Sequence, residues 1–144
     1  MRRAVILAAA VAALASVTAA APAHAAPGGF PVVVIAHTDF TTEVSEFDSN
    51  VPGCESGTVV NGDVHISFTP WGGIFVGEKV FTCADGDSGF TVSLKARFGP
   101  GGSTGTWNLA DAWGAYTGVK GSGSLVGTPM SETILDDVYT GIVR

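Results

Sequence analysis

The amino-acid sequence predicts an all-β protein, built as a single antiparallel up-and-down barrel of about eight strands, with a β-sandwich as the alternative. Short segments rich in β-branched and aromatic residues recur at intervals of about 10 to 15 residues, with no helical pattern between them. Residues 90–98 alternate between apolar and polar, which is typical of an antiparallel sheet with one buried face. Gly77, Gly121 and Gly123 lie inside predicted strands, where they permit the bends of a small closed barrel and so favour it over a sandwich.

Residues 1–25 have the parts of a secretory signal peptide. Arg2 and Arg3 precede an apolar run that reaches about Leu14, and Ala23-His24-Ala25 offers small residues where signal peptidase cleaves. The apolar core is shorter than the roughly 20 residues that cross a bilayer, and no cysteine at the cleavage site could carry a lipid. We therefore expect a secreted, extracellular protein with no stable membrane anchor.

One domain is expected after the signal peptide. Residues 26–31, mostly Ala, Pro and Gly, predict a flexible lead-in, and residues 32–144 a single β-barrel domain. A chain of 144 residues is too short for a TIM barrel or a two-domain cofactor enzyme. The chain has 13 acidic residues against 7 basic ones, of which Arg2 and Arg3 leave with the signal peptide. So acidic a surface would repel a nucleic-acid backbone, and no nucleic-acid partner is expected.

The first strands follow from β-branched runs. Residues 32–38 contain three consecutive valines and an isoleucine, which fit a strand better than a helix. A second extended segment is predicted over residues 41–47, and residues 48–53 are expected to form a loop that leads to Cys54.

The segment 58–68 alternates but is interrupted by Asn61-Gly62. Asn-Gly is a strong hairpin signal, yet only three residues of the segment precede it, so we favour one long bulged strand over a hairpin. The turn is expected instead at residues 70–73, where Pro, Trp and two glycines follow one another. The next strand then presents one face made of Phe75, Gly77, Lys79, Phe81 and Cys83.

The second half of the domain repeats this pattern of strands and tight turns. Residues 83–90 predict a hairpin tip, and residues 99–102 predict the turn after the alternating strand. Gly102 is expected in a loose turn, whereas Gly118 is expected at positive φ in a tight approach between strands. The remaining strands are predicted over residues 104–109, 119–126 and 134–143.

Cys54 and Cys83 are the only cysteines in the chain. In an oxidising compartment, a single pair in a small domain predicts one disulfide. A crosslink of this length contributes roughly 3 to 4 kcal/mol in the chain-entropy treatment. The alternative, a nucleophilic or metal-binding thiolate, would need partner ligands that the sequence does not supply.

Residues 107–123, from Trp107 to Gly123, carry a family resemblance. Their glycine-aromatic-glycine pattern resembles that of the allene oxide cyclase and dirigent barrels, especially uncharacterised secreted bacterial relatives of that superfamily. Cys54, the run Cys83-Ala84-Asp85-Gly86 and the terminal Tyr139-Thr140-Gly141 are similar to features of those relatives. The resemblance implies an eight-stranded calycin-like barrel with an interior cavity. It carries over no catalytic residue, and Trp113 departs from the dirigent pattern, where a small residue is usual.

No reaction centre is visible, so the catalytic residues are unknown. Of the histidines that follow the signal peptide, His37 lies near Asp39 and His65 alternates with apolar neighbours, and structural roles are favoured for both. Residues 85–89 offer closely spaced oxygen ligands but lack the glutamate of an EF-hand, so a solvated hairpin is favoured over a calcium site. We expect no metal site and no cofactor.

The candidate binding residues are Trp71, Trp113 and Tyr116. The two tryptophans lie in predicted turns, where their rings either cover an end of the barrel or contact a ligand or protein. Asp136 and Asp137 are adjacent and so face opposite sides of a strand, which leaves one of them free to point into the barrel.

Three functions are consistent with these features. The first is binding of an apolar small molecule in the barrel, which an open apolar cavity would favour. The second is a cyclase or isomerase that works by confinement, which a cavity with a perturbed inward carboxylate would favour. The third is binding or inhibition of a protein through loop tryptophans, which a filled barrel with an exposed aromatic patch would favour. The ligand and the oligomeric state are not predicted.

Overall fold

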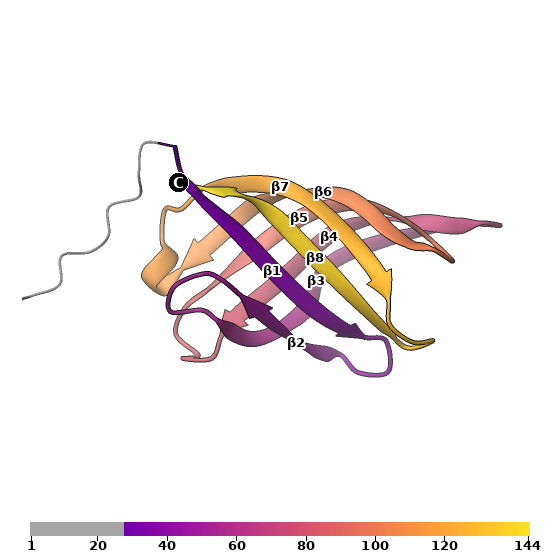
Figure 1. Cartoon of the computed structure of the whole chain (residues 1–144), viewed down its shortest axis with the longest axis horizontal. Helices are drawn as coiled ribbons and strands as arrows, with labels where there is room; N and C mark the ends of the chain where they lie inside the picture. The colour runs from indigo at the N-terminus through magenta and orange to yellow at the C-terminus, as the bar shows by residue number, and fades with distance from the viewer. Residues whose placement is uncertain (1–27) are drawn as a thin grey trace, which may run out of the picture.

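A computed structural model describes residues 28–144, which form a closed barrel. The eight strands are arranged in chain order, each antiparallel to its neighbours, and β1 closes the barrel against β8 (Figure 1). The predicted all-β up-and-down barrel is therefore confirmed, and the sandwich alternative is wrong. The predicted signal peptide, residues 1–25, lies outside the described residues.

The strands are β1 (Phe30–Asp39), β2 (Val44–Ser49), β3 (Ser56–Thr69), β4 (Gly72–Cys83), β5 (Gly89–Gly99), β6 (Gly102–Trp113), β7 (Gly121–Pro129) and β8 (Ile134–Val143), and a short 3-10 turn, η1 (Gly114–Tyr116), follows β6. β1 begins at Phe30, earlier than expected, because Phe30 and Pro31 pair with the end of β8. β2 is shifted towards the C-terminus, and takes up Asp48 and Ser49 from the predicted loop, because these residues pair with β1. Both differences come from pairing partners that are remote in sequence.

The β3–β4 hairpin confirms the choice made at Asn61-Gly62. β3 passes through these residues as one strand, and its pairing with β4 shifts register between Asn61 and Val64. The turn lies at Pro70-Trp71, as predicted. Figure 1 shows this hairpin reaching beyond the neighbouring strands at one end of the barrel.

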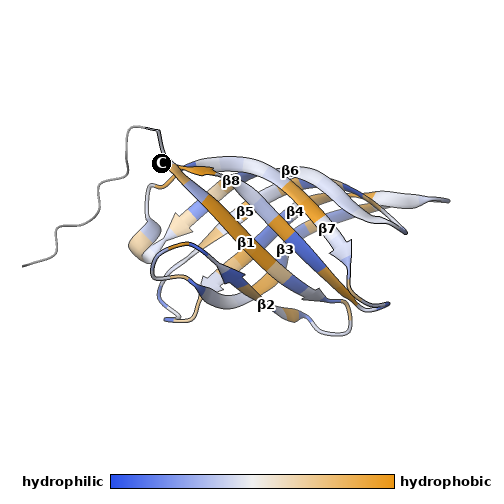
Figure 2. Ribbon diagram, in the orientation of Figure 1, coloured by the Kyte–Doolittle hydropathy of each residue, from blue (hydrophilic) through white to orange (hydrophobic). Residues whose placement is uncertain are grey.

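Aromatic rings fill the middle of the barrel. Phe81 lies at their centre, stacked on Phe90 at 4.9 Å between ring centroids and in edge contact with Phe47 at 5.2 Å and Tyr139 at 5.5 Å. Phe81 is fully buried, so truncation to alanine would cost about 3 to 5 kcal/mol. The inward residues of β1, Val32, Val34 and Ala36, also join this core, and Figure 2 shows β1 as hydrophobic over most of its length.

The predicted disulfide between Cys54 and Cys83 is present, with 5.0 Å between the Cα atoms. It joins Cys54, just before β3, to Cys83, the last residue of β4, so it closes the base of the β3–β4 hairpin. Both cysteines are buried. The bond therefore anchors the long hairpin at the end of the barrel opposite its tip.

The two ends of the barrel differ in their loops. At one end, called the open end, lie the connections 40–43, 70–71, 100–101 and 130–133. At the other, called the capped end, lie the connections 50–55, 84–88 and 114–120. Tyr116 Oη donates a hydrogen bond of 2.7 Å to the Pro52 carbonyl and so ties two capped-end connections together.

Candidate functional site

A large cavity lies inside the barrel towards the open end. It has a volume of about 670 Å³, and residues of the open-end connections, including Phe40 and Pro100, form its mouth. Its walls are mainly apolar, with Phe75, Leu94 and Ala96 facing inwards from β4 and β5. Ligand pockets in proteins generally measure about 300 to 1,000 Å³, so this cavity can hold a small molecule.

Tyr139 lies at the floor of the cavity, where its ring packs against Phe81 of the barrel core. Lys79 precedes Phe81 by one inward position on β4, and Asp137 precedes Tyr139 by one inward position on β8. Both strands run from the open end to the capped end. Lys79 and Asp137 therefore lie one layer above the floor, on opposite walls. The charged groups of these two side chains are deeper in the cavity than most of its apolar lining.

Lys79 is half-buried in this cavity. Its Nζ atom lies 5.7 Å from the centroid of the Phe75 ring, which favours the protonated amine. Burial nevertheless lowers the pKa of Lys79, with the charge of Asp137 acting in the opposite direction. The alternating pattern of β4 predicted Lys79 on an otherwise apolar face. A lysine on such a face is the sequence signal that could have identified it as a site residue.

Asp137 is buried, with 6% of its surface exposed. Thr38 Oγ1 donates a hydrogen bond of 3.0 Å to its Oδ2, and Ser103 Oγ donates one of 3.4 Å to its Oδ1. Burial raises the pKa of Asp137, while Lys79 and the two hydroxyls oppose the shift. Asp137 is thus the member of the adjacent aspartate pair that points into the barrel, as the sequence allowed.

Tyr139 supplies an unsatisfied polar atom at the floor. Its side chain is buried, and its hydroxyl is the buried side-chain polar atom without a hydrogen-bond partner in residues 28–144. Burial raises the pKa of Tyr139 well above its usual value, so the hydroxyl keeps its proton and can donate it in a hydrogen bond. The hydroxyl is therefore a donor for which residues 28–144 supply no acceptor.

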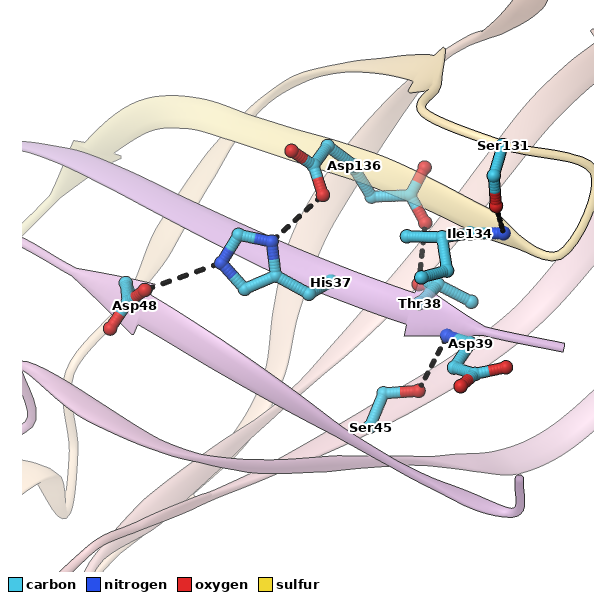
Figure 3. A network of polar contacts seen from close by, with 9 residues as sticks. His37, Thr38, Asp39, Ser45, Asp48, Ser131, Ile134 and Asp136 are labelled. Atoms are coloured by element: carbon cyan, nitrogen blue, oxygen red, sulfur yellow. Dashed lines mark hydrogen bonds and ion pairs between the residues drawn. The ribbon is translucent and has the colours of Figure 1, made fainter. Parts of the chain in front are cut away.

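The other aspartate of the pair, Asp136, faces outwards and contacts His37. Figure 3 shows His37 of β1 between Asp136 of β8 and Asp48 of β2. Its Nδ1 lies 2.8 Å from Asp136 Oδ1 and its Nε2 lies 3.2 Å from Asp48 Oδ2. His37 is hydrogen-bonded, as predicted, but its partners do not include the nearby Asp39, which accepts hydrogen bonds from Thr41.

The remaining polar candidates have local roles. His65 is exposed and shares a 3.2 Å hydrogen bond with Ser67 Oγ. Asp85 Oδ1 accepts hydrogen bonds from the backbone N–H groups of Asp87 and Ser88, so this carboxylate stabilises the hairpin tip. Within residues 28–144, no three His, Cys, Asp or Glu side chains gather where they could hold a metal ion.

The structure does not bring the three predicted binding residues together. Trp71 is 86% exposed on the β3–β4 turn at the open end. Trp113 is half-buried at the capped end, where its ring covers Gly89. Tyr116 lies at the same end and lines a small apolar cavity of about 50 Å³. Trp71 is therefore the one of the three on the side of the large cavity.

No protein-family model matches the chain, and searches of the curated proteins and of the solved structures return no match. None of the helical turns in the described residues is long and apolar enough to cross a bilayer. The cavity and the side chains that line it are therefore the features that point to a function.

Proposed function

We propose that this protein binds an apolar small molecule inside the barrel, through the cavity at the open end. The observation that carries the proposal is the 670 Å³ of space above the Phe81–Tyr139 floor. A barrel that served only as a rigid scaffold would gain stability by filling such space with side chains, because interiors are normally close-packed. Secretion stays part of this proposal, and a buried disulfide is compatible with an extracellular location.

The charges favour a ligand with no net charge and one polar end. Lys79 and Asp137 provide one group of each sign inside the cavity, so a carboxylate head would meet Asp137 and an amine head would meet Lys79. At the mouth, Glu43 and Glu132 lie on the open-end connections, which contain no lysine or arginine. The carboxylates of these two glutamates would repel an anion. A neutral polar group can instead reach the hydroxyl of Tyr139.

We also propose a relationship to the allene oxide cyclase and dirigent barrels. It is supported by the closed eight-stranded antiparallel topology and by the glycine-aromatic-glycine stretch, which ends β6 and leads into β7 through η1. The relationship would explain a cavity inside the barrel, and it assigns no residue a catalytic role.

Enzymatic activity of the cyclase or isomerase type is the second candidate function. The specific observation in its favour is Asp137, an inward carboxylate whose pKa is raised by burial, as is common for groups that transfer protons in active sites. Binding of an apolar molecule is common to both functions.

A protein partner is the third candidate, and exposed apolar residues at the open end favour it. Phe68 is 79% exposed and Phe40 66% exposed, and both lie close in sequence to turns of that end. The same residues line the mouth of the cavity, which also suits the passage of an apolar molecule.

Blocking the cavity tests the binding proposal. In Ala96→Phe, an added ring on the inward face of β5 would occupy the cavity, so we expect binding of the uncharged dye N-phenylnaphthylamine to weaken by about tenfold or more. Dye fluorescence measures binding, and circular dichroism checks that each variant folds. Ser93→Phe, on the exposed face of the same strand, is the matched control and should bind as the parent protein does. Equal dye binding by both folded variants would contradict the proposal.

A further inference from the structure

Lys79 is the only basic side chain among residues 28–144 that lines the large cavity. No carboxylate of the described residues forms an ion pair with it, and the ion pairs of that part of the chain are those of His37. The amine is half-buried on the inward face of β4, within reach of a molecule that enters from the open end. Its position is thus that of a reactive group rather than of a structural ion pair.

Burial shifts the amine of Lys79 towards its neutral, nucleophilic form, against the opposing effects of the Phe75 ring and of Asp137. Burial among apolar side chains lowers its pKa, which raises the fraction of amine that carries a lone pair at neutral pH. Asp137, on the opposite wall, has a raised pKa because it too is buried, so it can hold a proton or release one. A nucleophile and a proton-transfer group therefore line the same cavity.

We propose that Lys79 forms a reversible imine with the aldehyde or ketone group of an apolar molecule bound in the cavity. This inference deepens the ligand-binding function proposed above and rests on it. A carbonyl group is a neutral polar head, which suits a cavity whose inner walls carry one basic and one acidic side chain, those of Lys79 and Asp137.

The reaction balances without an oxidant or reductant. The lone pair of Lys79 Nζ forms a bond to the carbonyl carbon, the carbonyl oxygen takes up a proton, and the nitrogen loses one, which gives a carbinolamine. The hydroxyl then leaves as water with a proton delivered from Asp137, and the C=N bond forms. The imine nitrogen stays protonated and Asp137 is left as a carboxylate on the opposite wall, so the net charge of the cavity is unchanged. Addition of water reverses each step.

Trapping the imine tests the proposal. The folded protein is incubated with decanal and sodium cyanoborohydride, which reduces an imine to a stable amine. We expect an intact-mass increase equal to one decanal less one oxygen atom, and peptide mapping should place it on Lys79. Because the cavity holds decanal next to Lys79 and burial lowers the pKa of its amine, we expect Lys79 to react several-fold faster than the exposed Lys95.

Two variants separate covalent reaction from simple binding. Lys79→Met should lose the fast adduct yet still release N-phenylnaphthylamine when decanol, which cannot form an imine, is added. Lys95→Met, the matched surface control, should keep the fast adduct. If decanol displaces the dye but Lys79, Lys95 and Lys120 are labelled equally slowly, the imine proposal is wrong and the binding function stands. Failure of decanol to displace the dye from the parent protein would overturn the binding function itself.

Discussion

Tyr139 has a buried hydroxyl group that the fold itself does not use. A buried polar group without a partner costs about 1 to 3 kcal/mol relative to one that is hydrogen-bonded, and the rest of the Tyr139 ring is held by its contact with Phe81. A ligand bound as proposed would supply the partner that the fold does not.

The variant Tyr139→Phe tests this explanation. It removes the unsatisfied oxygen and keeps the ring, so we expect the free energy of unfolding to stay the same or rise by up to about 1 kcal/mol. Binding of decanol should weaken roughly threefold to tenfold through loss of one hydrogen bond. Urea denaturation and dye displacement measure the two effects. A loss of stability would instead show that the hydroxyl has a structural partner.

At the scale of the elements, the glycines at the turns have unequal roles. Gly102, which opens β6, has φ +117, and a Cβ atom there would collide with the Gly127 carbonyl oxygen of β7. Gly118 has φ +84, as expected, but a Cβ atom there would meet nothing within 4 Å. The expectation that Gly118 is the more closely packed of the two is therefore wrong. Gly102 is packed against β7, whereas Gly118 has open space where its Cβ atom would be.

We therefore expect Gly102→Ala to destabilise the protein more than Gly118→Ala. Gly118→Ala should cost about 1 to 2 kcal/mol, the strain of a left-handed backbone. Gly102→Ala should cost at least about 1 kcal/mol more, because the collision with β7 adds to the strain. Urea denaturation of the two variants gives the comparison. Equal losses would mean that β6 and β7 can separate enough to admit a methyl group.

At the scale of the whole molecule, His37 stabilises the closure of the barrel. It lies on β1 between β2 and β8 and contacts an aspartate on each, so it spans the seam where the first and last strands meet (Figure 3). Its pKa is raised, chiefly by the hydrogen bond to Asp136, against an opposing effect of burial. A raised pKa means that the charged histidine stabilises the folded state.

This contribution is fully present below the unfolded-state pKa of 6.5 and is lost as the pH rises through the higher folded-state value. Because the side chain is 42% exposed, solvent screening limits the effect to roughly 0.5 to 1 kcal/mol. Parent protein and His37→Gln should thus differ more in unfolding free energy at about pH 6 than at about pH 8. Urea denaturation at both values measures this, and a difference independent of pH would show that His37 acts without its charge.

Much of the architecture followed from local patterns. The alternation over residues 90–98 predicted an inward and an outward face for β5, and the structure has both. The bulge at Asn61-Gly62, the turn at Pro70-Trp71 and the Cys54–Cys83 disulfide were also predicted. These features depend on the chemistry of adjacent residues, or on a single available partner, and so they can be seen in a linear sequence.

The site depended on tertiary structure. Lys79 could be placed on an apolar face, and one of two aspartates could be expected inside, but nothing local relates β4 to β8 across the barrel. Strand order and register place Lys79, Asp137 and Tyr139 in one cavity, and the same packing leaves Tyr139 Oη unpartnered. Trp71 is remote from Trp113 and Tyr116 for the same reason, since the ends of a barrel are separated by the full length of its strands. The period of the side chains determines the faces of a strand, whereas closure of the sheet determines which faces meet.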